Sequence, residues 1–332
     1  MHQNKPKRVS VALATYNGAT YISQQLESFA AQTLRPSEIV ISDDGSQDDT
    51  LSIINRFSQH APFQINVLKA QARLGYSKNF ERALSACIGD IILMSDQDDV
   101  WLPQKIKTIF SIFESRDDLK CIINDISITD EQLVPSGVTQ LALIKRLCGS
   151  DFQFVAGCGT AMRRDWREFV LPFPDCGIPY DSWINVLAKR LDVSYIHPVA
   201  MQYYRRHGNN TTSSQFARPQ ALRLFHPDFG RWLGGKAPHA FDCARSELLA
   251  YRDRIASADG RSFVDRGRLR RAIQKLDDEL ELVATRKKIV GLPRRRRVYA
   301  IATLLFRGDY GAASGVSSAV KDLVAPRLKA AD

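Results

Sequence analysis

The sequence predicts an α/β protein with a mostly parallel sheet flanked by helices, followed by a helical carboxyl-terminal extension. Short apolar runs alternate with segments of helical periodicity in the first half, polar clusters follow three of these runs, and the final third is helical throughout. Alternation of strands and helices is typical of a parallel sheet with helices on both faces. At 332 residues, the chain is long enough for one large domain and a smaller appendage.

Apolar runs in the first half indicate buried strands. The expected strands are residues 9–14, 38–42, 65–68, 91–94 and 120–128. Between them, apolar residues recur at the spacing of amphipathic helices. These residues are Ile22, Leu26, Phe29 and Ala30, then Leu51, Ile54 and Phe57, then Phe80, Ala83, Leu84 and Cys87, and finally Ile106, Ile109, Phe110 and Phe113. Pro103 suits the first turn of the helix that contains Ile106 and Phe113, because the backbone N–H groups of a first helical turn have no partner within the helix.

The pattern changes after Phe152. We expect a strand from Phe154 to Met162 interrupted by two glycines, a helix from Asp181 to Arg190, one or two strands from Val193 to Tyr204, and a turn-rich stretch from Arg205 to Pro219. Helices follow over residues 240–256, 268–286 and 296–306. We therefore expect an α/β domain over residues 1–220 and a basic helical region over residues 221–332.

The composition is that of an ordinary globular protein, with 44% apolar and 25% charged residues. No segment reaches the ~18 uninterrupted apolar residues of a membrane span. The basic amino terminus lacks the hydrophobic region of a secretory signal, so we expect a cytoplasmic protein. Six scattered cysteines without metal-binding spacing are expected to be reduced and buried.

Positive charge is concentrated near the carboxyl terminus. Residues 240–332 contain 20 lysines and arginines and 12 acidic residues, which accounts for eight of the ten net positive charges. Arg294–Arg297 precede the apolar stretch Val298–Phe306, a pattern that suits a helix on an anionic membrane surface, here the inner face of the cytoplasmic membrane. The alternative is a helix packed on the core with a solvated basic end. Nucleic-acid binding is not expected, because no aromatic platform accompanies the arginines.

Three polar clusters, residues 15–18, 43–46 and 96–99, fall at the carboxyl ends of expected strands, where parallel α/β sheets bind ligands. Asp96 and Asp98 lie on the same side of an extended backbone. Two such carboxylates can share a hard divalent cation, Mg²⁺ or Mn²⁺, which can in turn bind a diphosphate. A solvated acidic loop is the alternative.

Other polar residues are candidates for the same ligand. A nucleotide base can stack on Tyr16 or lie beside it, and the Asp43–Asp44 turn can accept hydrogen bonds from a base or a ribose. Arg73 and Lys78 bring positive charge near the expected diphosphate. The alternatives are ordinary turns for the first two and solvated surface charge for the cations.

Asp181 and His207 are candidates farther along the chain. Asp181 can be a general base that takes a proton from an acceptor hydroxyl, or only the N-cap of a helix. His207, next to a glycine in a polar segment, can close over a diphosphate and provide a metal ligand. A solvated surface histidine is the alternative.

Several motifs occur in order along the first two thirds of the chain. They are Val11–Gly18, Ile41–Asp48, Leu74–Phe80, Met94–Trp101, Gly157–Thr160, Tyr180–Trp183 and Tyr204–Asn210. Together they resemble the family 2 glycosyltransferases of the GT-A fold over roughly residues 8–215. The resemblance is closest to bacterial rhamnosyltransferase-like members, which build surface polysaccharides.

The resemblance implies transfer of a sugar, with inversion, from a nucleoside-diphosphate sugar to a hydroxyl of a glycan or lipid-linked acceptor. The implied donor is dTDP-rhamnose or a UDP-sugar, and the implied cofactor is Mg²⁺ or Mn²⁺. The implied roles are nucleoside contact for Thr15, Asn17 and Asp44, ribose or metal contact for Asp96, metal ligation for Asp98, metal or phosphate ligation for His207, and the catalytic base for Asp181.

Two positions depart from the family pattern. Arg73 stands where many relatives have asparagine, which leaves the phosphate-side contact there open. Tyr180 and Asp181 stand where an acidic pair is common, so the base assignment depends on Asp181 alone.

Two rival functions fit the same residues. One is a catalytically silent scaffold subunit that binds a sugar nucleotide. The other is a nucleotidyltransferase, which would release pyrophosphate instead of a nucleoside diphosphate.

Overall fold

The computed structural model describes residues 7–148, 156–208, 210, 237–261, 263–309 and 316–325. The chain divides into two compact units, Met1–Thr211 and Thr212–Asp332. The two units are described separately below.

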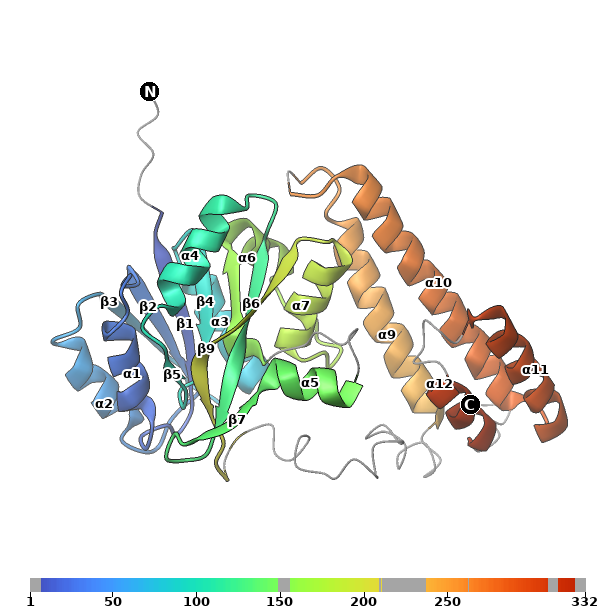
Figure 1. Cartoon of the computed structure of the whole chain (residues 1–332), viewed down its shortest axis with the longest axis horizontal. Coiled ribbons are helices and arrows are strands. Elements are labelled where there is room, and N and C mark those ends of the chain that lie inside the picture. Colours follow the sequence, from blue (N-terminus) through green and yellow to red (C-terminus); the bar gives the residue numbers. More distant parts are fainter. Residues whose placement is uncertain are drawn as a thin grey trace. The chain divides into compact units, whose positions relative to one another are not determined.

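One sheet forms the centre of the first unit (Figure 1). Within the described residues its strands are β1 (Val9–Thr15), β2 (Glu38–Asp43), β3 (Gln64–Lys69), β4 (Ile91–Ser95), β5 (Val100–Trp101), β6 (Cys121–Thr129), β7 (Pro135–Thr139), β8 (Thr160–Arg163) and β9 (Ser194–Arg205). Their order is β3-β2-β1-β4-β8-β6-β9-β5, and β7 pairs with β6.

The sheet is mostly parallel, as predicted. β1 to β4 run in one direction, and β6 and β9 share it because β8 is antiparallel to both β4 and β6. β5 and β7 run against this direction, as β8 does. The carboxyl ends of β1, β2 and β4 therefore meet at one edge of the sheet. The three polar clusters that follow these strands converge there.

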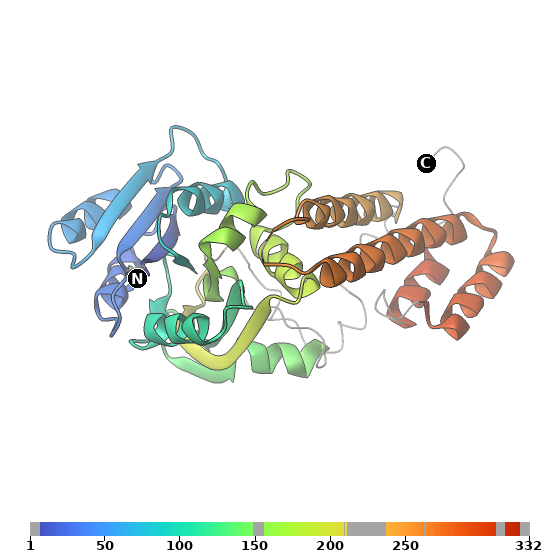
Figure 2. The same ribbon diagram turned by 90° about the horizontal axis from the view of Figure 1, so that it is seen from above.

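Helices cover both faces of this sheet. The described helices of the first unit are α1 (Ile22–Ala30), α2 (Thr50–Ser58), α3 (Tyr76–Ala86), α4 (Lys105–Ser115), α5 (Gln140–Cys148), α6 (Arg164–Val170) and α7 (Tyr180–Arg190), with a short 3₁₀ turn, η1, at Gly157–Gly159. Alternate residues of β1, β2 and β4 pack with α1, α2 and α4 in one hydrophobic core. α3 contacts β1 and β2 and lies on the opposite side from α4 (Figure 2).

The sequence prediction differs from the structure in several short elements. The expected strand from Phe154 to Met162 is instead the η1 turn followed by β8, because consecutive small residues break the ladder before Thr160. The sequence patterns also did not indicate β5, β7, α5, α6 and a short carboxyl-terminal helix, α12 (Val316–Val324). Residues 154–155, 209 and 211–219 of the expected elements lie outside the described residues.

The carboxyl-terminal unit is helical where it is described, as predicted. Its helices are α9 (Ala237–Ala256), α10 (Arg266–Gly291), α11 (Arg294–Arg307) and α12 (Val316–Val324). Phe241, Val290 and Ala325 form one small core, and Ile289 and Ile301 lie in another. In the described part of the chain, no helix is both long and apolar enough to cross a membrane.

Arg297 corrects one expectation about the basic run. Its side chain is only 1% exposed and donates to the carbonyl oxygens of Val290, Leu292 and Ala325. These carbonyls lie at the ends of α10 and α12, where backbone acceptors lack helical partners. Arg297 therefore holds the helices together, and the solvated part of the run is Arg294–Arg296.

The cysteine prediction holds for Cys87, Cys121 and Cys158, which are free and buried. It is wrong for Cys243, which is exposed, and Cys176 is intermediate.

Candidate active site

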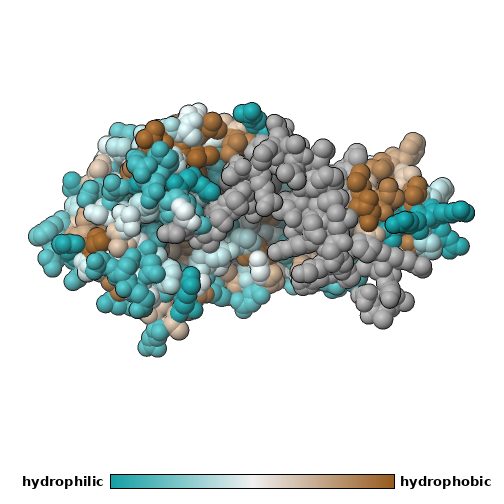
Figure 3. Space-filling view, turned by 90° about the horizontal axis from the view of Figure 1, so that it is seen from below, coloured by the Kyte–Doolittle hydropathy of each residue, from teal (hydrophilic) through white to brown (hydrophobic). Residues whose placement is uncertain are grey.

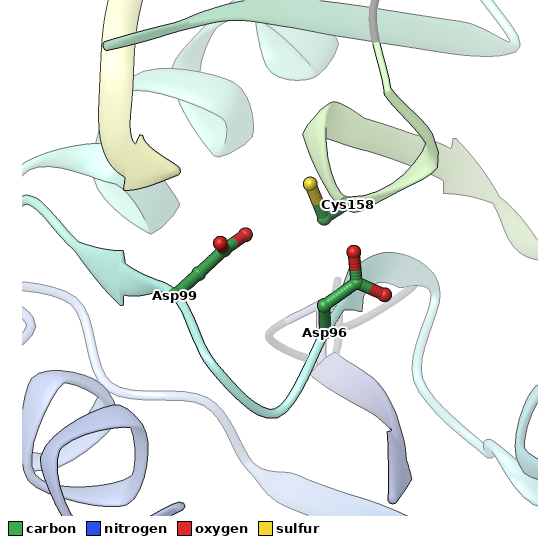
Figure 4. Close-up of side chains that lie close together, drawn as sticks. All are labelled: Asp96, Asp99 and Cys158. Carbon is green, nitrogen blue, oxygen red and sulfur yellow. The ribbon is translucent and has the colours of Figure 1, made fainter. Parts of the chain in front are cut away.

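An acidic turn at residues 96–99 links β4 to β5 at the carboxyl edge of the sheet. Asp96 and Asp99 stand at its two ends and point toward Cys158 of η1 (Figure 4). Within the described residues, one ligand atom from each of these three side chains lies within 4.8 Å of the other two. The turn therefore gathers negative charge at one point of the sheet edge.

Asp99 is held inside the protein. Its side chain is fully buried, one carboxylate oxygen accepts from Nε2 of Gln202 at 2.7 Å, and the other accepts from the backbone N–H of Arg205 at 3.4 Å. Both oxygens are thus bonded to β9. Asp99 therefore orients the turn.

Asp98 and His207 lie together, as the resemblance implied. His207 Nε2 is 2.8 Å from a carboxylate oxygen of Asp98, and Asn210 donates to the same oxygen at 3.3 Å. The two side chains are 14% and 8% exposed. Arg205 Nε donates to the backbone carbonyl of Asp98 at 2.9 Å, so the end of β9 holds this turn in place.

Burial raises the pKa of Asp96 to about 7, and neighbouring carboxylates add to this effect. Burial is the main cause, followed by the negative charges of Asp98 and Asp181. Burial and the charges of Asp98 and Asp96 likewise hold the pKa of Asp99 well above its ordinary value. Strong perturbation of several groups at a strand end is typical of a functional site.

Asp181 lies in the first turn of α7, near Asp96. Its carboxylate accepts from the N–H of Ser182 at 2.7 Å and from the backbone N–H of Gly157. Burial nevertheless raises the pKa of Asp181 above its ordinary value. The N-cap position of α7 belongs to Pro179, so the N-cap alternative for Asp181 is wrong.

Gly157 packs directly against Tyr180, the residue before Asp181. A methyl group on Gly157 would lie 2.5 Å from the Tyr180 hydroxyl oxygen, too close for any real contact. Glycine is therefore required where η1 meets α7. Tyr180 is buried, and burial with the charges of Asp96 and Asp181 raises the pKa of its hydroxyl.

The candidates after β1 divide into buried and exposed residues. Thr15 is 1% exposed and its hydroxyl donates to Asp43 at 2.8 Å. Tyr16 is half-buried, and its backbone N–H and carbonyl pair with the amide of Gln97 at 2.9 and 3.0 Å. Asn17 is exposed, and its side-chain oxygen accepts from the N–H of Gln47 at 2.8 Å.

The loop before α3 lies beside Tyr16. Asp44 is 3% exposed and accepts from the N–H groups of Leu74 and Gly75, at 2.5 and 3.0 Å, so it anchors this loop. The Arg73 guanidinium stacks 4.2 Å from the centre of the Tyr16 ring and remains exposed. Tyr16 and Arg73 thus form one flat, positively charged surface.

Lys78 is neutralised by its own neighbours. Its ammonium group lies 3.1 Å from Asp175 and 3.3 Å from Glu81, and these partners raise its pKa. The structure thus brings Lys78 to the amino-terminal end of α3 with its charge already paired.

Sequence reasoning missed four residues that organise the site: Gln97, Lys105, Gln202 and Arg205. Arg205 is 3% exposed and also donates to Gln24 at 2.5 Å. Lys105 is 1% exposed. The sequence marks these four residues only by their closeness to motif residues. Nothing in a sequence distinguishes a buried lysine or arginine from a solvated one.

Asp96 and Asp98 offer carboxylate oxygens, and His207 places a ring nitrogen beside Asp98, so these donor atoms suit a hard divalent cation. Carboxylate oxygens suit Mg²⁺ and Mn²⁺, and a positive ion would relieve the repulsion that raises the pKa of Asp96. Asp99 fits less well because both its oxygens are engaged. Cys158 also fits poorly, because burial and nearby carboxylates raise the pKa of its thiol and keep it protonated.

Comparison with known proteins identifies the family of this chain. The family model described as glycosyl transferase family 2 matches residues 10–170. An uncharacterized glycosyltransferase of Nostoc sp. is 31% identical over 64% of this chain and 71% of the relative. The dTDP-rhamnosyl transferase RfbG of Shigella flexneri is 41% identical over 62% of this chain and 75% of the relative.

The fold has solved counterparts. The crystal structure of S. aureus TarS 1–349 in complex with UDP-GlcNAc matches with a TM-score of 0.58, covering 96% of this chain and 90% of that chain at 16% identity. This likeness concerns the fold, which is GT-A. From the family model and the identity to these relatives, the chain belongs to glycosyltransferase family 2.

Proposed function

We propose that this chain is an inverting glycosyltransferase that moves a sugar from a nucleoside-diphosphate sugar to a hydroxyl of a glycan or lipid-linked acceptor, in bacterial surface polysaccharide synthesis. The observation that carries the proposal is the linkage of a half-buried Asp181 to the acidic turn. Asp181 is close enough to raise the pKa of Asp96, and η1 contacts both carboxylates.

Asp181 is the proposed general base. Its raised pKa makes it a stronger proton acceptor than a solvated aspartate, while the N–H groups of Gly157 and Ser182 fix its orientation. It would remove the proton from the acceptor hydroxyl as that oxygen attacks the anomeric carbon. A single displacement of this kind inverts the anomeric configuration.

Asp98 and His207 would hold the divalent cation, with Asp96 directed to the metal or the ribose. Bound Mg²⁺ or Mn²⁺ supplies neutralisation of the charge on the departing diphosphate. Tyr16 and Arg73 are the proposed surface for the base, and Asn17 contacts the nucleoside beside them. Thr15 and Asp44 support this surface from inside, and Lys78 lies at its phosphate side with a paired charge.

dTDP-rhamnose is the favoured donor, because the relative with 41% identity is named a dTDP-rhamnosyl transferase. A UDP-sugar is the alternative, since an E. coli relative with 28% identity is named a UDP-Glc:α-D-GlcNAc-diphosphoundecaprenol β-1,3-glucosyltransferase. Thermal shift with Mn²⁺ and each of dTDP, UDP, dTDP-rhamnose and UDP-glucose distinguishes them, because a ligand of the folded state stabilises by mass action.

The released product tests the reaction class. A glycosyltransferase releases a nucleoside diphosphate, whereas release of pyrophosphate would identify a nucleotidyltransferase. Binding of donor without either product, across Mg²⁺ and Mn²⁺ and with lipid-linked saccharide acceptors, would favour a silent scaffold subunit. The ¹H NMR spectrum of the product then reports the anomeric configuration, and retention would overturn the proposed mechanism.

We also propose that α11 meets an anionic membrane surface, beside a lipid-linked acceptor. Val298, Tyr299, Leu305 and Phe306 are exposed by 53%, 78%, 38% and 96%. They recur at helical spacing on a face away from the packed Arg297 and Ile301. Hydrophobic side chains gather beside hydrophilic ones on the carboxyl-terminal unit (Figure 3).

The arginines complete this surface. Arg294 and Arg295 lie one turn before Val298 and Tyr299 on the same face of the helix and are exposed. Apolar residues with arginines at one end suit a helix lying in the headgroup layer of an anionic bilayer. The proposed localisation is therefore the cytoplasm, peripheral to the inner face of the cytoplasmic membrane.

A further inference from the structure

Lys105, the first residue of α4, places a buried amino group at the centre of the site. Its side chain is 1% exposed, and its ammonium group donates to Oε1 of Gln202 and, at 3.2 Å, to the carbonyl oxygen of Cys158. The same group lies 3.9 Å from the centre of the Trp101 ring. An ammonium group buried this far costs several kcal/mol unless it is well bonded.

One contact of Lys105 leads to the acidic turn. Gln202 accepts from Lys105 through its oxygen and donates through its nitrogen to Asp99 at 2.7 Å. The amide can satisfy both bonds only in one orientation. Lys105 therefore fixes Gln202, and Gln202 fixes the end of the turn that carries Asp96 and Asp98.

The other contact leads to the proposed base. Lys105 binds the carbonyl of Cys158 in η1, and the preceding residue, Gly157, donates its N–H to Asp181. The 3₁₀ turn is only three residues long, so a shift of the Cys158 carbonyl moves the Gly157 amide with it. Lys105 thus contacts the two segments on which catalysis would depend.

We propose that Lys105 is a positioning residue that fixes the acidic turn relative to Asp181. It touches neither substrate nor metal in this role and acts through Gln202 and η1. The inference rests on the proposed roles of Asp98 and Asp181, but the contacts themselves are those of the structure. Lys105 thus has two arms, the contact through Gln202 to Asp99 and the contact with the Cys158 carbonyl of η1. Two variants separate these arms, because each variant removes a different set of hydrogen bonds.

Lys105→Met removes both arms while keeping an unbranched side chain of similar length. Gln202→Met removes only the arm to Asp99. Hydrogen–deuterium exchange is measured on peptides covering residues 96–99 and 156–160. Lys105→Met raises exchange in both by about threefold or more, whereas Gln202→Met raises it only in the first.

Metal binding and kinetics give independent readouts. With Mn²⁺ alone as probe, both variants weaken binding by about ten- to hundredfold, as loss of a supporting contact does. With donor and acceptor, Lys105→Met additionally lowers kcat, whereas Gln202→Met leaves the acceptor KM unchanged. Arg297→Met is the matched control, since it removes a buried cation of the other unit and leaves exchange in both peptides unchanged.

The proposal is overturned if folded Lys105→Met shows wild-type exchange in both peptides, or if Gln202→Met changes the 156–160 peptide as much as Lys105→Met does. If Lys105→Met does not fold, the Gln202→Met variant decides alone. Increased exchange confined to the 96–99 peptide supports the proposal, and unchanged exchange in that peptide overturns it. The exchange result is independent of the reaction. A chain without transferase activity would therefore refute the proposed function without deciding the role of Lys105.

Discussion

Asp181 combines burial with a charge that the proposed reaction needs. Burial raises its pKa, so the neutral form is favoured in the folded protein more than in the unfolded chain. Ionisation of Asp181 therefore destabilises the fold as the pH rises from the ordinary aspartate value of 3.8 through the raised folded-state value. Function and stability make opposite demands on this one carboxyl group.

Asp181→Asn should separate these demands. Asparagine keeps an oxygen acceptor for Gly157 and Ser182 but cannot take a proton, so kcat falls by about a hundredfold to ten-thousandfold. At pH 7 the melting temperature is unchanged or higher, because the destabilising ionisation is gone. Asp117→Asn, at a side chain that is 90% exposed, is the control. Wild-type kcat in Asp181→Asn would show that Asp181 is not the base.

The pH profile tests the same group in the native enzyme. The base must be deprotonated, and burial raises the pKa of Asp181. On acidification, kcat/KM should therefore begin to fall at a pH above the pKa of an ordinary aspartate. The residual activity of Asp181→Asn lacks this acidic limb. An unchanged limb in that variant would assign it to another group, such as the carboxylates of the acidic turn.

At the scale of elements, the site depends on how η1 meets α7. The 3₁₀ turn brings the Gly157 amide to Asp181 and its Cα against Tyr180. A second element, the end of β9, brings Gln202 and Arg205 to the acidic turn. These contacts join segments about 100 residues apart in sequence.

Gly157→Ala should impair function through this contact. The new methyl group would lie 2.5 Å from the Tyr180 hydroxyl oxygen, and overpacking of this kind costs about 1–3 kcal/mol. Displacement of Tyr180 also displaces Asp181, so kcat falls more than the donor KM changes. Gly291→Ala, where a methyl group meets nothing within 4 Å, is the control in chemical denaturation and kinetics. Equal behaviour of the two variants would contradict the argument.

At the scale of the whole molecule, the net charge of the carboxyl-terminal unit does not show how much of that charge is exposed. Most of the net positive charge is in the carboxyl-terminal region. However, Arg297 caps helix ends, and Arg286 forms an ion pair with the fully buried Asp322. Arg294–Arg296, at the start of α11, are exposed and form the part of this charge that we propose for a membrane surface.

Vesicle co-sedimentation tests this face. Substitution of Arg294–Arg296 by serine should lower partitioning to vesicles containing phosphatidylserine by about a hundredfold, at about 1 kcal/mol per arginine. Phe306→Glu should also weaken binding, because it removes the most exposed apolar side chain. Val134→Glu, at a residue of the first unit that is 59% exposed, is the control. Equal pelleting of wild type and the triple serine variant would reject membrane binding through this face.

Periodicity determined most of the fold in advance. Strands β1 to β4, β6 and β9 and helices α1 to α4 and α7 follow from apolar spacing, because burial of one face imposes a regular pattern on the sequence. Short elements such as β5, β7 and α6 lack room for a period and were not predictable. The Gly157–Gly159 segment showed its glycines, but not whether it would be a strand or a turn.

The sequence alone also marked Asp96, Asp98, Asp181 and His207, because each is a reactive side chain in a motif at a strand end or a turn. Only the tertiary structure decided which polar groups bond to each other inside the protein. Thr15, Asp44, Asp99 and Arg297 are buried with internal partners, and Lys105 lies between the acidic turn and η1. Their environment arises from contacts between distant segments, and desolvation, which sets charge and pKa, is a property of packing that local sequence does not encode.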